Sequence, residues 1–374
     1  MGKRNRHILI ITILIVSFIL VVAACSNSNI VPINTINKTA EAMAPDKETY
    51  PITKVEKKIF TDEQILSYVQ QFTNSTEMYS DWGAIGDLTK DTSTVSSTSQ
   101  LILSELESGV YHDAYIKQAD GSIAQCTFAR NHNNFAYRKN MNLEVYPQSL
   151  IDEDMATYMP KSPSISKQSA HEQALEYAND IGANDLSLFT EEACTIVLDG
   201  EIDSYGWIFT FTRNIDGLQK IYYPSSYYLN PNVPPDYGSP WEPEFLRIAI
   251  NEEGLCLLWY EGACKITNEE NMSAKIEDVD TMEAQAIDTL QKIFASSSTD
   301  EEALDINITK FELGIDLLSS EKKADQGEYI PTWTVNFDYG YPDSTFKSQS
   351  SIVLNAIDGS YIEPRVTNQY LAGI

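Results

Sequence analysis

The chain has 374 residues, with 54 acidic and 26 basic side chains and a formal net charge of −28. Nucleic-acid binding depends on a basic surface that neutralises phosphates, so this charge argues against a nucleic-acid partner; it equally disfavours a protein that lies flat on an anionic membrane. The hydrophobic fraction of 43% is typical of a globular protein, and the length allows two or three domains.

The first 24 residues have the layout of a secretory signal peptide. The basic residues Lys3, Arg4 and Arg6 precede an apolar run from residue 8 to residue 24. This run ends in Val22-Ala23-Ala24-Cys25, which resembles a bacterial lipobox, where the cysteine thiol receives a diacylglycerol before the signal is removed. The resemblance implies a lipoprotein of a Gram-positive bacterium, held on the outer side of the cell membrane by palmitate-type acyl chains on Cys25.

The next two segments are predicted to differ in order. Residues 25–58 are rich in polar residues with little apolar periodicity, which predicts a flexible tether. Residues 59–160 are predicted to form an N-terminal region of mixed helix and strand. Within it we expect a helix from Thr61 to about Phe72, a loop over residues 88–99, and a hairpin that turns at Asp120-Gly121. Asn131 to Asn134 predict the following turn.

The rest of the chain is predicted to form two modules, residues 161–270 and 271–374, in which the same elements recur. Each begins with a helix, 166–183 in the first and 280–295 in the second, and we expect the first to be capped by Ser169 and Glu172. Strands follow at 194–198, 207–211, 246–254 and 255–259 in the first module. In the second they follow at 306–317, 333–337, 351–359 and from 361 onward. A period near ~110 residues indicates two like domains, each an antiparallel sheet with one helix on its face, so the predicted fold class is α+β.

The two helices each have one predicted apolar face. That face consists of Ala170, Ala174, Leu175, Ala178 and Ile181 in the first helix, and of Met282, Ala286, Leu290, Ile293 and Phe294 in the second.

This order of elements resembles a known family. A helix with spaced alanines, a strand such as Trp207–Phe211 or Trp333–Phe337, and a hydrophobic strand ending in an acid and glycine are similar to a PepSY-type module. The pattern also resembles two-module extracytoplasmic lipoproteins and membrane-anchored regulators of Gram-positive bacteria, and it covers about residues 165–366. The resemblance implies an inhibitory or regulatory binder of surface proteases, sensor kinases or wall enzymes, with no catalytic residue to carry over.

A Tyr/Pro-rich insertion, residues 221–243, departs from that pattern. Its prolines favour an extended chain, and its aromatic rings are of the kind that anchor interfaces or stack on sugars. The predicted contact residues are Tyr222, Tyr223, Tyr227, Tyr228, Tyr237 and Trp241. The alternative is a loop that folds back over the sheet, with its rings covering an edge of the core.

The remaining reactive residue types form no catalytic or metal-binding motif. The cysteines Cys126, Cys194, Cys256 and Cys264 either form disulfides, which an exported protein permits, or are buried free thiols. His112, His132 and His171 are isolated, and we expect no metal and no cofactor. We therefore hypothesise a non-enzymatic lipoprotein that binds and modulates a protein partner at the membrane or cell wall. The alternatives are a solute- or glycan-binding lipoprotein that uses residues 221–243, and a cell-wall hydrolase with two close carboxylates, one of raised pKa.

Overall fold

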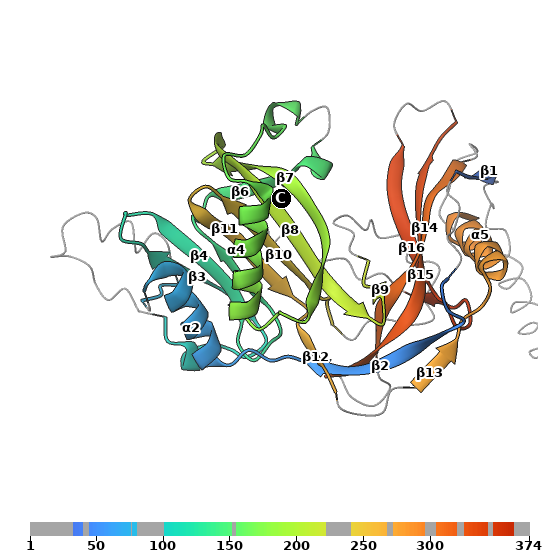
Figure 1. Cartoon of the computed structure of the whole chain (residues 1–374), viewed down its shortest axis with the longest axis horizontal. Coiled ribbons are helices and arrows are strands. Elements are labelled where there is room, and N and C mark those ends of the chain that lie inside the picture. Colours follow the sequence, from blue (N-terminus) through green and yellow to red (C-terminus); the bar gives the residue numbers. More distant parts are fainter. Residues whose placement is uncertain are drawn as a thin grey trace, which may run out of the picture.

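The computed structural model describes residues 33–39, 45–75, 77–80, 101–151, 155–221, 241–267, 272–295, 304–319, 325–342 and 347–362. These residues form an α+β fold with two sheets side by side (Figure 1). The helices α2 (Asp62–Thr73) and α4 (Lys167–Asp180) lie on one face of the first sheet, and α5 (Val279–Ala295) lies on the second. The predicted loop at residues 88–99 lies outside the described residues. Among the described helices, none is long and apolar enough to cross a bilayer.

The first sheet has nine strands. They are β3 (Tyr111–Lys117), β4 (Ile123–Ala129), β5 (Phe135–Arg138), β6 (Leu143–Pro147), β7 (Leu186–Leu198), β8 (Glu201–Ile215), β9 (Leu218–Gln219), β10 (Phe245–Asn251) and β11 (Gly254–Glu261). The spatial order is β3-β4-β5-β11-β10-β8-β7-β6, with β9 paired to β8, and every described pair is antiparallel.

This sheet consists of two meanders, β3 to β5 and β7 to β11, joined where β5 pairs with β11. Strands from the predicted N-terminal region (59–160) and from the first predicted module (161–270) therefore share one sheet. The hairpin predicted at Asp120-Gly121 is confirmed by β3 and β4, and Gly121 has the positive φ of 88° that such a turn needs. The turn predicted at Asn131 is also confirmed, with φ of 56° at that residue.

The two helices on this sheet begin at polar caps. Thr61 and Gln64 form a capping box at the start of α2, so the predicted helix is confirmed. The predicted cap of α4 is wrong, because Ser166 accepts a hydrogen bond from the Ser169 N–H at 3.1 Å and is itself the N-cap. The predicted face is wrong at Leu175, which is 48% exposed, because it lies a full 100° around the helix from Ala174.

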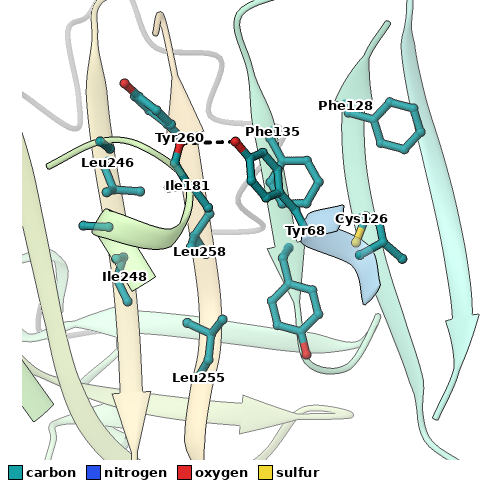
Figure 2. Close-up of a cluster of buried hydrophobic side chains, with 14 of the residues drawn as sticks. Tyr68, Cys126, Phe128, Phe135, Ile181, Leu246, Ile248, Leu255, Leu258 and Tyr260 are labelled. Atoms are coloured by element: carbon teal, nitrogen blue, oxygen red, sulfur yellow. Dashed lines mark hydrogen bonds between the residues drawn. The ribbon is translucent and has the colours of Figure 1, made fainter. Parts of the chain in front are cut away.

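The main core lies between these helices and the first sheet. Ala170, Ala174 and Ala178 lie one turn apart on α4, and their small side chains let the helix pack closely on the strands. Figure 2 shows Tyr68 of α2 among the rings and aliphatic side chains of this core, with its hydroxyl group donating to the Ile181 carbonyl at 3.3 Å. Tyr68 also packs edge-on against Phe135, at 5.4 Å between ring centroids.

The second sheet is built on a long hairpin. Its strands are β1 (Ile33–Lys38), β2 (Thr49–Lys57), β12 (Cys264–Ile266), β13 (Met272–Lys275), β14 (Leu304–Ser319), β15 (Gln326–Gly340), β16 (Ser348–Asn355) and β17 (Tyr361–Ile362). The central order is β1-β14-β15-β16-β17, and β2 pairs with β12, β13 and β15. All five residues of the predicted apolar face of α5 are buried in the core of this sheet, as expected.

The predicted repetition of elements is present in the described residues. Helix α4 is followed by the meander β7-β8-β10-β11, and α5 is followed by the meander β14-β15-β16-β17. Both meanders contain longer strands than the sequence predicted, because backbone pairing continues into half-exposed polar residues. A third, shorter run was not expected: α2 is followed by the three-stranded meander β3-β4-β5.

The expectation of a flexible tether up to residue 58 is wrong from residue 49 onward, and also for residues 33–38. Residues 49–57 form β2, with Tyr50 and Val55 buried in the second core, and β1 pairs in parallel with β14. The prediction failed because the buried residues of β2, Tyr50, Thr53 and Val55, do not form a two-residue alternation of apolar side chains.

Candidate functional site

Most of the predicted contact residues lie outside the described part of the chain, as does the predicted lipidation site Cys25. This holds for Tyr222, Tyr223, Tyr227, Tyr228 and Tyr237. The two residues that flank the segment 222–240 are described, and both are buried.

Ile221 packs against Gly314 of the second sheet, and Trp241 is 1% exposed. The indole N–H of Trp241 donates to the Gly262 carbonyl at 3.3 Å, and Lys57 Nζ lies 5.5 Å from the ring centroid. Trp241 therefore belongs to the core and offers no exposed ring to a partner.

All four predicted disulfide cysteines are buried free thiols, which is the second of the two interpretations drawn from the sequence. Burial raises the pKa of each thiol, in the case of Cys256 to about 12. The reactive form of cysteine is the thiolate, so these side chains remain protonated and unreactive near neutral pH.

The described histidines are not brought together. His112 is half-exposed and contacts the Glu107 carbonyl at 3.1 Å, while the His171 ring stacks on Phe209 at 5.2 Å. His132 lies in the turn between β4 and β5. Within the described ranges no three His, Cys, Asp or Glu side chains form a group that could hold a metal ion.

A buried ionic network joins the two sheets. Arg213 of β8 has no exposed side-chain surface and forms a two-pronged ion pair with Glu244, at 2.7 and 2.8 Å. Arg213 also donates to the Cys264 carbonyl at 3.1 Å and pairs with Asp185, which is half-exposed. Burial alone would lower the pKa of Arg213, but the carboxylate of Glu244 outweighs this and holds the pKa above its usual range.

Glu244 carries the network into the second sheet. Its carboxylate accepts the Cys264 N–H at 3.0 Å, the Tyr260 hydroxyl at 3.2 Å and the Tyr329 hydroxyl of β15 at 3.4 Å. A second connection lies nearby, where Lys220 pairs with Asp316 of β14 at 2.7 Å. Because each charge of the network has a partner, we assign the network a positioning role. It holds the two sheets together next to residues 221 and 241, the ends of the segment 222–240.

A second cluster contains a buried acid without a partner. Glu261 is the last residue of β11 and is 0% exposed; within the described structure neither of its carboxyl oxygens has a hydrogen-bond partner. Burial, reinforced by the nearby carboxylate of Glu242, raises the pKa of Glu261 to about 8. The indole N–H of Trp259, on the same face of the strand, opposes this rise only in part.

Two further groups surround this acid. The pKa of Tyr111 is raised by burial and by the charges of Glu261 and Glu242. Its hydroxyl accepts a hydrogen bond from the Asn134 side chain, and its ring lies 6.0 Å from that of His132. Burial, with help from Lys57, lowers the pKa of His132. Near neutral pH this cluster can therefore hold a proton on Glu261.

Sequence reasoning missed both clusters. Arg213 and Glu244 are 31 residues apart, on either side of the Tyr/Pro-rich insertion, and no local pattern links them. A signal for Glu261 did exist. Strand alternation places Leu257, Trp259 and Glu261 on one face, so an acid continues a row of buried apolar residues.

Comparisons with known proteins concern the fold. No family model matches the chain, and no curated protein matches it. An uncharacterized protein from Eubacterium rectale ATCC 33656, known as a crystal structure, is similar with a TM-score of 0.52 and 12% sequence identity, over 89% of this chain and 92% of that one. The C-terminal domain of Bacillus megaterium YpeB aligns with a TM-score of 0.32 and 9% identity, over 81% of this chain and 96% of that domain. The similarity to the first protein extends over nearly the whole of both chains and concerns the fold alone. The alignment with the second has too low a TM-score to assign a fold.

Proposed function

We propose that this chain is a membrane-anchored surface lipoprotein that catalyses no reaction and binds and modulates a protein partner at the membrane or cell wall. The observation that carries the proposal is the apolar leader ending in Val22-Ala23-Ala24-Cys25. Acylated Cys25 would hold the mature chain on the extracytoplasmic face of the bilayer, because two acyl chains anchor a protein stably where one does not.

The position of β1 supports a function close to the membrane. Cys25 lies eight residues before Ile33, where β1 begins. Even a fully extended chain of this length spans at most about 28 Å. The edge of the second sheet that pairs with β1 is therefore within that distance of the anchor, and partners embedded in or bound to the membrane are in reach.

The repeated helix-plus-meander units support a PepSY-like assignment for the two tandem modules. In both, one helix, α4 or α5, is followed by an antiparallel four-stranded meander with the strands in the same order. In proteins of this type, as the sequence resemblance implies, such modules bind and regulate rather than catalyse. We therefore assign the binding role to this scaffold and to the Tyr/Pro-rich segment 222–240.

The ends of that segment favour it as the contact surface. Ile221 and Trp241 are both buried at the junction of the sheets, beside the Arg213–Glu244 pair. A segment fixed at both ends loses less conformational entropy on binding than a free one, and its tyrosines supply rigid contact area.

The test is in-cell crosslinking of the native lipoprotein, followed by mass spectrometry of what is captured. We expect metabolic palmitate labelling that Cys25→Ser abolishes, and a recurrent membrane or wall protein whose capture falls at least tenfold in Tyr227→Ala/Tyr228→Ala. Tyr341→Ala is the matched control, because Tyr341 is an exposed tyrosine in another loop. Capture of no protein above a secreted control would overturn the proposal. Binding of a cell-wall glycan or solute by the soluble form would then favour the ligand-binding alternative.

One observation bears on the hydrolase alternative. Glycosidases need two nearby carboxyl groups, and Glu261, whose pKa is raised to about 8, has the carboxylate of Glu242 close to it. Glu261 has no exposed surface, however, so a substrate cannot reach it in this structure. Turnover of purified cell wall that is lost in Glu261→Gln would establish the hydrolase; no turnover by the wild type would exclude this role for the pair.

A further inference from the structure

We propose that Glu261 and Glu242 form a proton-controlled latch, in which a proton on Glu261 keeps residues 241–244 packed on residues 261–264, and loss of that proton loosens them. The latch lies in described residues and involves none of the segment 222–240. The inference goes beyond the proposed function, because its readout is conformational and needs no partner.

The packing of the two short segments is unusually close. Gly262 has a positive φ of 64°, and a Cβ atom there would lie 2.3 Å from the Glu242 carbonyl oxygen and 2.5 Å from that of Pro243. Only glycine allows this approach. Trp241 donates to the Gly262 carbonyl, and the Cys264 N–H donates to Glu244, so the segments are joined on both sides of Glu242 and at two positions directly after Glu261.

The charge arrangement makes this packing depend on a proton. Two ionised carboxylates close together repel each other, and the indole N–H of Trp259 offsets the charge of the buried Glu261 only in part. The groups that face it are Glu242 from the opposing segment, Tyr111 from β3 and Trp259 from its own strand. His132 and Lys57 lie one layer further out. None of the three facing groups supplies a positive charge, so protonation of Glu261 is the means of neutralising the site.

The direction of the effect follows from linkage. Glu261 binds its proton more tightly in the latched state, with a pKa of about 8, than in an open state, where the pKa returns to the usual glutamate value of 4.5. The latched state is therefore favoured fully below pH 4.5, and loses ground as pH rises from 4.5 to about 8. Within that window the equilibrium between open and latched states shifts tenfold per pH unit, and above pH 8 it stops changing.

Hydrogen exchange of the soluble chain from residue 26 onward, which keeps every described residue, tests the latch between pH 5.5 and 7.5, with rates corrected for the intrinsic pH dependence. In the wild-type sequence we expect protection of peptides covering residues 262–266 to fall about tenfold per pH unit. In Glu261→Gln the corrected protection should not vary with pH. Glu201→Gln, which changes an exposed acid on β8, should behave like the wild type.

Peptides from β16 serve as the internal reference, because this strand lies in the core of the second sheet. A flat pH profile for residues 262–266 in the wild type would overturn the latch. So would protection of residues 262–266 as high as that of β16 at each pH, because the segment would then open only when the whole protein unfolds. Should Glu261→Gln fail to fold, Glu242→Gln removes the repelling charge instead and should flatten the profile in part.

Discussion

Replacement of Arg213 by methionine is expected to destabilise the protein by about 3–5 kcal/mol, the range measured when one partner of a buried ion pair is removed. Methionine keeps most of the side-chain volume, so the loss is electrostatic rather than a cavity. Arg213 and Glu244 both have 0% exposed side-chain surface, and the variant leaves the Glu244 charge buried without its ion-pair partner, among the hydroxyl groups of Tyr260 and Tyr329 and the thiol and N–H of Cys264.

A double-mutant cycle isolates the interaction energy between Arg213 and Glu244, with the free energy of unfolding of each variant measured by urea denaturation. Glu244→Gln alone should also be costly, because it leaves a buried guanidinium group with only the half-exposed Asp185 as its ionic partner. The double variant should be less destabilised than the sum of the two, with a coupling energy of at least about 2 kcal/mol. The exposed pair Asp288–Lys292 on α5 is the matched control and should couple by only about 0.3–0.5 kcal/mol. A coupling energy for Arg213 and Glu244 no larger than that of the control would refute the assignment of a positioning role to the network.

Three further predictions follow from particular residues. In the wild type, the raised pKa of Glu261 should make the free energy of unfolding decline by up to about 5 kcal/mol between pH 4.5 and about 8. In Glu261→Gln this decline should be absent. Urea titrations at pH 5 and pH 8 compare the two proteins. Gly262→Ala should lower the melting temperature far more than Gly121→Ala, because both glycines have positive φ but only at Gly262 would the new Cβ meet backbone atoms; equal shifts would contradict the close packing. Cys126, Cys194, Cys256 and Cys264 should react with a thiol reagent only after denaturation, and rapid labelling of the folded protein at pH 7.5 would contradict their burial.

The parts of the fold that depend on local sequence were predictable. Thr61 and Gln64 mark the start of α2, and the apolar spacing of Met282 to Phe294 marks the buried face of α5, because helix caps and 3.6-residue periodicity act over a few residues. The same is true of the hairpin at Gly121 and of the order of elements in the two modules.

The features that depend on distant pairing were not predictable. Nothing near β5 indicates that it joins β11, over a hundred residues later, and nothing in the Lys- and Thr-rich residues 49–57 indicates that they complete the second sheet. The candidate site has the same limitation. The partner of Arg213 follows an insertion, and Trp241, which the sequence grouped with the tyrosines of that insertion, belongs to the core because its indole N–H reaches Gly262.

The most direct test of the proposed function places a photo-crosslinking amino acid at position 227 of the lipoprotein in living cells, with position 341 as the control. A membrane or wall protein that crosslinks from position 227 and not from position 341, and that is lost when a secretory signal without a lipobox replaces residues 1–25 and releases the chain, is the predicted result. Identical crosslinking from both positions, or none from either, would contradict a surface lipoprotein that binds a partner through its Tyr/Pro-rich segment.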